Sequence, residues 1–313
     1  MSDTRPPVID AEAVEVAPAA PQAAQSGLPA VQTPAADIAA PARKTRRWKL
    51  TIEYDGTAFA GWQRQDGGIT TIQGSIEDAI EKYSGERVTV HVAGRTDAGV
   101  HALGQVAHID LARPADEKTV RDAINFHLRP LPISIVSAEA VSDDFHARFS
   151  ATWRVYAYRI LCDRRAAPAL GGAQVWHHSR DLDIDAMNKA AKHLTGTHDF
   201  SSFRASVRTG DFAWHSAARK LLKSYEDKTS PMLGRHLTMW AEARSFLHHQ
   251  IRNFAGTLAL VGEGKWQPDD VKAVLEACDR TKAGPMAPAS GLHLVRVEYG
   301  PKDPFQQGLD SLI

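Results

Sequence analysis

The chain has 313 residues, enough for one large or two medium-sized domains, and its 37 acidic and 37 basic side chains give a formal net charge of zero. Its two cysteines, Cys162 and Cys278, lack CxxC or Cys/His finger spacing, which argues against a disulfide framework and a structural zinc and suits a reducing compartment. No apolar run approaches the roughly 20 residues that span a bilayer, and no signal-peptide pattern opens the chain, so the sequence predicts a cytoplasmic protein.

The N-terminal segment is rich in alanine and proline. Residues 1–42 contain no aromatic side chain, and their prolines are too frequent for a continuous helix, which predicts a disordered tail. The tail is acidic, so the rest of the chain carries a modest positive excess that permits a polyanionic partner. The run "RKTRR" at residues 43–47 could contact phosphates or form a solvated junction, and we favour the junction. We therefore expect a tail over residues 1–47.

A first α/β half is predicted over residues 48–150. Alternating apolar and polar residues in "WKLTIEYDG" predict a strand, and helical spacing in "TTIQGSIEDAIEKYSG" predicts a helix that ends at Gly85. The segments "RVTVHVA" and "GQVAHIDLA" are typical of two strands, and the loop between them contains Asp97. A helix is expected from Glu117 to Leu128, before Pro130 and Pro132.

A second α/β half is predicted over residues 151–313. The strand "TWRVYAYRIL" places Tyr156 and Tyr158 on one face, and a helix follows in "DIDAMNKAAKHLTG". A strand in "RHLTMWAEAR" precedes a long amphipathic helix in "SFLHHQIRNFAGTLALVGEG", with Arg252 at the edge of its apolar stripe. A helix from Asp269 to Ala277 and a strand in "LHLVRVEY" complete an α+β arrangement. Two such halves imply a cleft between them.

Asp97 lies in a glycine-flanked loop, two residues after Arg95. A hydrolase or phosphotransferase would normally add metal ligands, and a glycosidase would need a second carboxylate about 5 to 10 Å away. Neither is evident from the sequence around this loop. A carboxylate that acts as a nucleophile must be ionised, and a nearby arginine favours that state. The alternative is that Asp97 is only a turn residue.

The sequence "GRTDAGVHALGQV" resembles the central motif of the TruA family of tRNA pseudouridine synthases. Further segments match the family in the same order: "IEYDGTAFAGWQRQ", "SIVSAEAVSDDFHARFSATWRVYAY", "LTGTHDFSSFRA", "EARSFLHHQIRNFAGTLALVGEGKW" and "APASGLHLVRVEYG". Together they cover nearly the whole chain from about residue 48. The resemblance implies the pseudouridine synthase fold, with mostly antiparallel sheets and flanking helices around a central active-site cleft.

Four residues receive roles from the resemblance. Asp97 would be the nucleophile, and Arg95 would help to open the stem and hold the flipped nucleotide. Tyr156 would stack on the target uracil, although on the residues alone it could equally be a core side chain. Arg252 would pair with the aspartate, and its alternative is an arginine that covers apolar surface at the helix edge.

Other polar residues of these motifs are weaker candidates. His146, Arg148 and Arg204 could contact phosphates or line the cleft, and solvated surface positions are nearly as plausible for them. His248 and His249 suggest a metal site, but adjacent residues point about 100° apart on a helix and no third ligand is spaced to join them. We expect packing or RNA contact for these two histidines and predict no metal.

The implied reaction converts uridine to pseudouridine at nucleotides 38, 39 and 40 in the anticodon stem-loop of tRNA. It needs no redox or energy cofactor, and the uracil must leave the stack to be reached. The resemblance also implies a homodimer in which one tRNA contacts both subunits. The main alternative is a tRNA-binding or tRNA-folding protein without catalysis. A metal-dependent hydrolase is a third possibility, and it lacks evident ligands.

Overall fold

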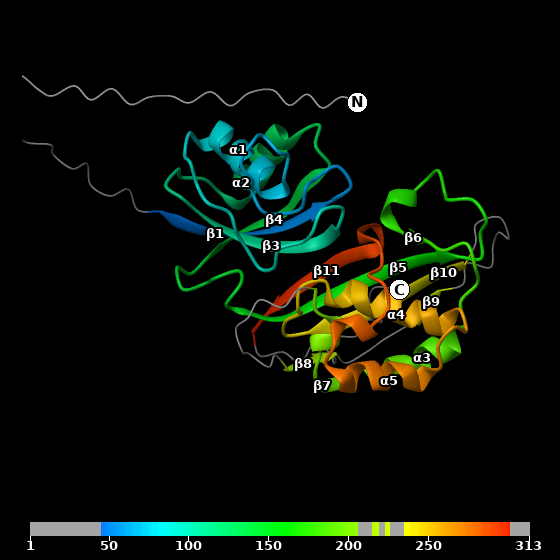
Figure 1. Ribbon diagram of the computed structural model, residues 1–313. Helices are drawn as coiled ribbons and strands as arrows, with labels where there is room; N and C mark the ends of the chain where they lie inside the picture. Colours follow the sequence, from blue (N-terminus) through cyan, green and yellow to red (C-terminus); the bar gives the residue numbers. More distant parts are fainter. Residues whose placement is uncertain (1–44, 206–214, 219–222, 226–234, 301–313) are drawn as a thin grey trace, which may run out of the picture. The chain divides into compact units, whose positions relative to one another are not determined.

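The computed structural model describes residues 45–205, 215–218, 223–225 and 235–300 (Figure 1). The tail expected to be disordered, residues 1–42, lies outside the described residues, as do Arg43 and Lys44 of the basic run. Among the helices that are described, none is long and apolar enough to cross a membrane.

A continuous nine-stranded sheet forms the centre of the fold, with the strand order β4-β1-β3-β11-β5-β10-β9 and with β2 paired to β3 and β6 to β5. All its pairs are antiparallel except β11 with β3 and β5 with β6. Its strands are β1 (Arg46–Tyr54), β2 (His91–Val92), β3 (His101–Leu111), β4 (Ile133–Val141), β5 (Ala151–Cys162), β6 (Trp176–His177), β9 (Lys223–Tyr225), β10 (Arg235–Ala243) and β11 (Leu292–Tyr299). A separate pair joins β7 (Gly196–Asp199) to β8 (His215–Ala218).

The helices fall into two groups on the sheet (Figure 1). The pair α1 and α2 covers the part formed by β4, β1 and β3, whereas α3, α4 and α5 lie against the part formed by β5 and β10. They span α1 (Ile72–Ser84), α2 (Glu117–Leu128), α3 (Ile184–Lys192), α4 (Gln250–Gly262) and α5 (Pro268–Ala277). Short 3-10 turns are η1 (Gly172–Gln174), η2 (Ser201–Phe203), η3 (Arg280–Lys282) and η4 (Ala289–Gly291).

Local sequence explains these elements. Alternate residues of β1 are buried, from Trp48 to Tyr54, so one strand face enters the core as its two-residue period requires. The helix α1 begins where the Thr71 side chain accepts a hydrogen bond from the Gly74 amide, and it ends at Gly85 in the left-handed conformation. One apolar cluster runs from these elements to Phe254 of α4, so a single core underlies both groups of helices.

The predicted α+β class, the mostly antiparallel sheet and most of the elements are confirmed. The strand expected in "RVTVHVA" is wrong for its first four residues, because the Val90 amide donates to the Glu77 side chain instead of pairing with a strand. The strand β4 was not anticipated, since a bulge opposite Thr51 and Ile52 interrupts its alternation.

The basic run also differs from the expectation. Arg47 was placed in a solvated junction, yet it lies within β1 and forms a bidentate pair with Asp110 at 2.8 Å. Arg46 lies over the ring of Trp48, at 4.9 Å from its centroid. Part of the basic run therefore belongs to the sheet.

Candidate active site

Asp97 lies in the turn between β2 and β3, and the surrounding loop is held from two sides. The Thr96 hydroxyl bonds the Tyr54 hydroxyl at 2.8 Å, and the Thr96 carbonyl accepts the Trp62 amide at 3.0 Å. Gly61 packs directly under this loop with φ +93°, and a Cβ there would be 2.9 Å from the Thr96 oxygen. The close backbone approach therefore requires a glycine at position 61.

Arg252 forms an ion pair with Asp97. Its Nη1 lies 3.3 Å from Oδ2 of the carboxylate, and its side chain is only 11% exposed. The guanidinium is fixed by a second bond, because Nε donates to the Ala287 carbonyl at 2.8 Å. The backbone carbonyl of Arg252 in turn accepts the Ala287 amide at 3.1 Å, which ties α4 to the segment before η4. The arginine is thus oriented before any substrate arrives.

Two adjacent histidines complete the surroundings of the carboxylate. His249 Nε2 lies 3.0 Å from Oδ2 of Asp97, and His248 Nε2 lies 3.4 Å from Oδ1. The sequence-based argument that these rings diverge is wrong, because α4 begins at Gln250 and not at the start of the predicted helix. His249 has φ +62° and precedes the helix, so the two rings lie close together with centroids 3.6 Å apart.

The protonation of His249 follows from its surroundings. Its Nδ1 is buried and has no hydrogen-bond partner within the described part of the chain, whereas its Nε2 lies 3.0 Å from Oδ2 of the carboxylate, so we place the proton on Nε2. Burial lowers the pKa of His249, the nearby Asp97 opposes this, and the neighbouring His248 and Arg252 charges reinforce it. The imidazole therefore binds Asp97 as a neutral donor at neutral pH.

Asp97, His248 and His249 are also a group that could hold a metal ion, since their ligand atoms lie within 4.8 Å of one another. The expectation that no third ligand joins the histidines is thus wrong. However, the Arg252 guanidinium already lies 3.3 Å from Oδ2, so a metal cation on that oxygen would be close to a fixed positive charge. The arrangement fits a carboxylate held by N–H donors better than a metal ligand set.

Tyr156 lies in a small pocket of about 120 Å³ next to the carboxylate. Its side chain is 8% exposed, and its ring stands edge-on to Phe246 with centroids 5.3 Å apart. Burial raises the pKa of Tyr156 to about 12, so its hydroxyl stays protonated at neutral pH. The pocket is lined by Arg95, Thr96, Asp97, Val100, Tyr156, Phe246, Leu247, His248, His249, Gln250, Ile251 and Leu292.

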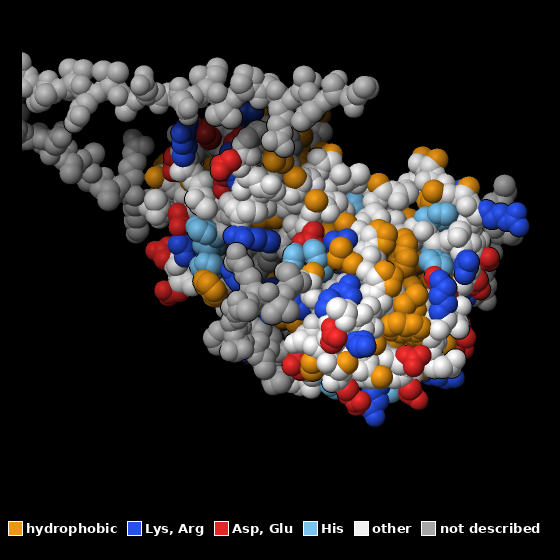
Figure 2. Space-filling model, in the orientation of Figure 1, with side chains coloured by type: hydrophobic (Ala, Val, Ile, Leu, Met, Phe, Trp, Pro, Cys, Tyr) orange, Lys and Arg blue, Asp and Glu red, His pale blue; other side chains and the backbone are white. Residues whose placement is uncertain are grey.

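A wider hollow of about 700 Å³ adjoins this pocket and shares Arg95, Tyr156, Phe246 and His248 with it. Among the described residues that line the hollow there are three arginines and no acidic side chain. Figure 2 shows Lys or Arg side chains and histidines near one another at the centre of the view. A set of guanidinium groups with no described acid among them favours an anionic ligand.

Comparison with known proteins identifies the family. Residues 50–150 and 190–300 match the family model described as tRNA pseudouridine synthase. The chain is 53% identical over 253 residues to tRNA pseudouridine synthase A of Paramagnetospirillum magneticum, covering 81% of this chain and 95% of that protein. The corresponding protein of Rhodospirillum centenum is 51% identical over 254 residues, covering 81% and 100% of the two chains. The chain belongs to the tRNA pseudouridine synthase family.

Most candidates taken from the sequence come together in this family member. Asp97, Arg95 and Tyr156 line the small pocket, and Arg252 reaches the carboxylate from α4. The hollow is lined by His146 and Arg148, at the segment between β4 and β5. Arg204 caps the 3-10 turn η2 and lines neither the pocket nor the hollow.

Several pocket residues of the pseudouridine synthase were not singled out for the site from the sequence. Phe246 packs on Tyr156, and Arg154 lines the hollow two residues before Tyr156 on β5. The two-residue period of a strand could have indicated Arg154, because it places residues 154 and 156 on one face. The positions of His248 and His249 depend on a break before α4 that helical periodicity does not reveal.

Proposed function

We propose that this protein converts uridine to pseudouridine at nucleotides 38, 39 and 40 in the anticodon stem-loop of tRNA, with Asp97 as the nucleophile. The contact between Asp97 and Arg252, on the wall of a pocket that also contains Tyr156, is the observation that carries the proposal. Membership of the tRNA pseudouridine synthase family supports an isomerase that acts on tRNA.

The reaction rearranges one nucleotide without adding or removing atoms. The bond between N1 and C1′ breaks, a bond between C5 and C1′ forms, and the C5 proton is exchanged for a proton on N1. The carboxylate would add to C6 of the uracil or act at C1′ of the ribose. In either route Oδ1 is the freer oxygen, because Oδ2 contacts both His249 and Arg252, while the contact of Oδ1 among the described side chains is with His248, whose side chain is 58% exposed.

The pocket supports a flipped nucleotide. Unstacking a base costs a few kcal/mol, which contacts in the pocket must offset. Tyr156 presents a buried ring beside the carboxylate for stacking on the uracil, and Arg95 lies at the boundary with the hollow, where it would hold the nucleotide. The protonated Tyr156 hydroxyl can donate a hydrogen bond but carries no charge that would repel the substrate.

Contacts with the rest of the tRNA are proposed for the arginine-lined hollow. His146 and Arg148 line it and would contact the RNA backbone, and Arg204 is a more distant candidate on the expectation from its motif. We further propose a cytoplasmic homodimer, as the family resemblance implies. Sedimentation of the purified protein would test the dimer directly.

The test is release of tritium from C5-labelled uridine in an unmodified tRNA transcript, without added metal or cofactor. Wild type should release tritium, and Asp97→Asn should release none while still binding tRNA, since the amide cannot act as a carboxylate nucleophile. Asp122→Asn on α2 is a matched control, because its carboxylate is about half exposed and, within the described part of the chain, pairs with the neighbouring Arg121. If these proteins bound tRNA but none of them released tritium, the non-catalytic tRNA-binding alternative would be favoured.

A further inference from the structure

Two imidazoles support the segment that leads into β5. His108, buried on β3, accepts the Ala147 amide on Nδ1 at 3.2 Å. His146 accepts the amides of Arg148 and Phe149 on its own Nδ1, at 3.1 and 3.4 Å. Three consecutive backbone amides are therefore held by two side chains, in a stretch where the chain belongs to no helix or strand.

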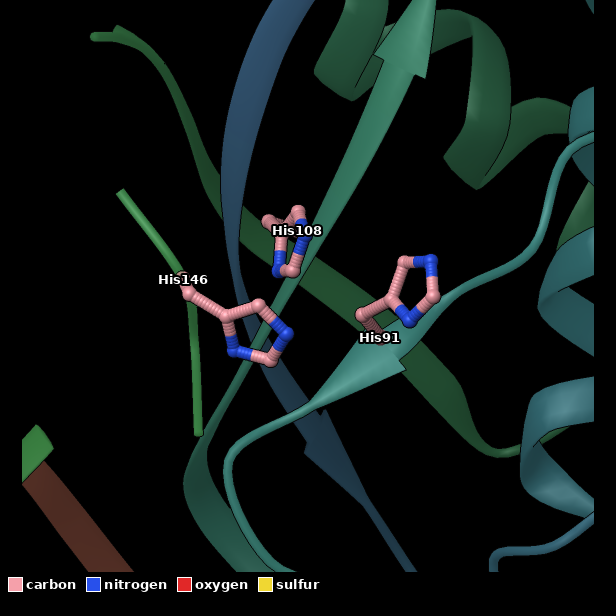
Figure 3. A group of neighbouring side chains, drawn as sticks. All are labelled: His91, His108 and His146. Carbon is pink, nitrogen blue, oxygen red and sulfur yellow. The ribbon is translucent and has the colours of Figure 1, made fainter. Parts of the chain in front are cut away.

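A third histidine joins this group. His91 on β2 faces His108 across the strand pair, and the two rings stack with centroids 4.8 Å apart. Figure 3 shows the ring of His146 pointing toward the other two. The ligand atoms of the three rings lie within 4.8 Å of one another, which resembles a three-histidine metal site.

The hydrogen bonds argue against a metal ion at this cluster. A neutral imidazole has one free nitrogen lone pair, and in His108 and His146 that lone pair already accepts a backbone amide. Their Nε2 atoms consequently carry protons and cannot bind a cation unless these backbone bonds break. Burial and the neighbouring His91 and Arg47 charges also lower the pKa of both rings, which keeps them neutral acceptors.

The segment that these histidines support, residues 147–149, presents an aromatic ring and a cation to solvent. Phe149 is 77% exposed, and its ring lies 4.4 Å from that of His146, centroid to centroid. The Arg148 guanidinium lies 5.7 Å from the same phenyl ring, and no acidic side chain of the described residues pairs with it. Arg154 donates to the Arg148 carbonyl at 3.1 Å and so fixes the backbone from the β5 side. Both Arg148 and Phe149 line the wide hollow beside Asp97.

We propose that Phe149 and Arg148 form a second nucleotide subsite, which binds a nucleotide next to the target uridine in the single-stranded part of the RNA. The base stacks on the exposed face of Phe149, and its phosphate contacts Arg148. The site rests on the proposed function, because its occupant belongs to the same RNA strand that enters the Asp97 pocket. An exposed aromatic ring beside a guanidinium that pairs with no described acid, in a hollow that no described acid lines, is the combination that binds unpaired nucleotides.

The subsite can be tested with an anticodon stem-loop RNA that carries 2-aminopurine beside the target uridine. Its fluorescence should be quenched when the base stacks on Phe149, in an otherwise intact chain carrying Asp97→Asn to prevent turnover. Phe149→Leu keeps an apolar side chain but removes the π face, so we expect loss of the quench and Kd raised about tenfold. Phe149→Trp should restore both.

Phe126→Leu is the matched control, because Phe126 is 68% exposed on α2 and does not line the hollow. It should leave quench and Kd unchanged, and an unaltered Tm for each variant would show that folding is intact. Equal quench and Kd for Phe149→Leu and the control would overturn the subsite. The proposed function is judged separately by tritium release. If Phe149 quenched the 2-aminopurine fluorescence but the wild-type chain never isomerised the RNA, the subsite would be supported and the catalytic proposal would be rejected.

Discussion

At the scale of single residues, the site depends on which oxygen of Asp97 is restrained. His249 and Arg252 both contact Oδ2, and both are held in place before substrate binds, one by a left-handed backbone position and the other by the Ala287 carbonyl. A non-glycine residue at φ +62° is uncommon, and such conformations concentrate at functional sites. The left-handed backbone here places one imidazole nitrogen beside the carboxylate.

Two substitutions of His249 should distinguish the contribution of its N–H group from that of its side-chain packing. Gln can place an N–H near the position of His Nε2, whereas Leu cannot, so His249→Leu should lower kcat about tenfold or more and His249→Gln should retain most of it. The pKa of His249 is lowered, so in the wild-type protein this imidazole becomes protonated only at a pH below the ordinary pKa of histidine. We expect an acid limb in the wild-type kcat profile that is absent in His249→Gln.

His193→Gln is the control for this comparison, since His193 contacts Asp269 at the surface away from the pocket. Its pH profile should match that of wild type. Equal kcat values for the Leu and Gln variants of His249 would show that the N–H contributes nothing to the reaction.

At the scale of elements, the loop that carries Asp97 depends on its contact with Gly61. Gly61→Ala would place a methyl group 2.9 Å from the Thr96 carbonyl oxygen and 3.1 Å from the Ala98 amide nitrogen, so the loop must move. We expect kcat/KM to fall at least tenfold, because misplacement of a reacting group by about 1 Å is costly. Tritium release at low substrate concentration measures this.

Gly67→Ala provides the comparison. Gly67 has a similar positive φ of +82°, yet a Cβ there would meet nothing within 4 Å. Both variants should lose about 1 kcal/mol of stability from the left-handed backbone, which urea unfolding reports. If both lost activity equally, backbone strain and not the displaced loop would explain the result.

The elements also show what the sequence could predict. A strand with clean alternation, such as β1, and capped amphipathic helices, such as α1 and α2, follow directly from local patterns. The first turn of α4 could not be placed, because Leu247 to Gln250 form a turn that is held by hydrogen bonds between these two residues and carries no helix-breaking residue. The proximity of Asp97 to Arg252 came from family resemblance, since a contact 155 residues apart has no local signature.

At the scale of the whole molecule, buried histidines should make stability depend on pH. Burial, with the charges of nearby His91 and Arg47, lowers the pKa of His108 to about 4, and burial with the Arg159 charge lowers that of His293 to about 3. The unfolded chain binds these protons at an ordinary pKa near 6.5. Between about pH 6.5 and 4 it therefore holds more protons than the folded chain, and the free energy of unfolding falls as the pH falls.

Urea unfolding at several pH values from 7.5 to 4.5 would measure this loss. His293→Gln cannot be protonated, so its stability should fall less steeply over the same interval even if it starts lower. A free energy of unfolding that stays constant from pH 7 to 4.5 would contradict the argument.

The position of β11 has a consequence for how the protein is made. This last strand of the sheet lies between β3 and β5, so it joins strands that are synthesised long before it. Until residues 292–299 leave the ribosome, the facing edges of β3 and β5 lack their partner, and unpaired edges are sites of association with other chains. The nascent chain is therefore exposed to aggregation along these edges until β11 is made, and the sheet that connects the Asp97 loop to Tyr156 closes only when residues 292–299 join it.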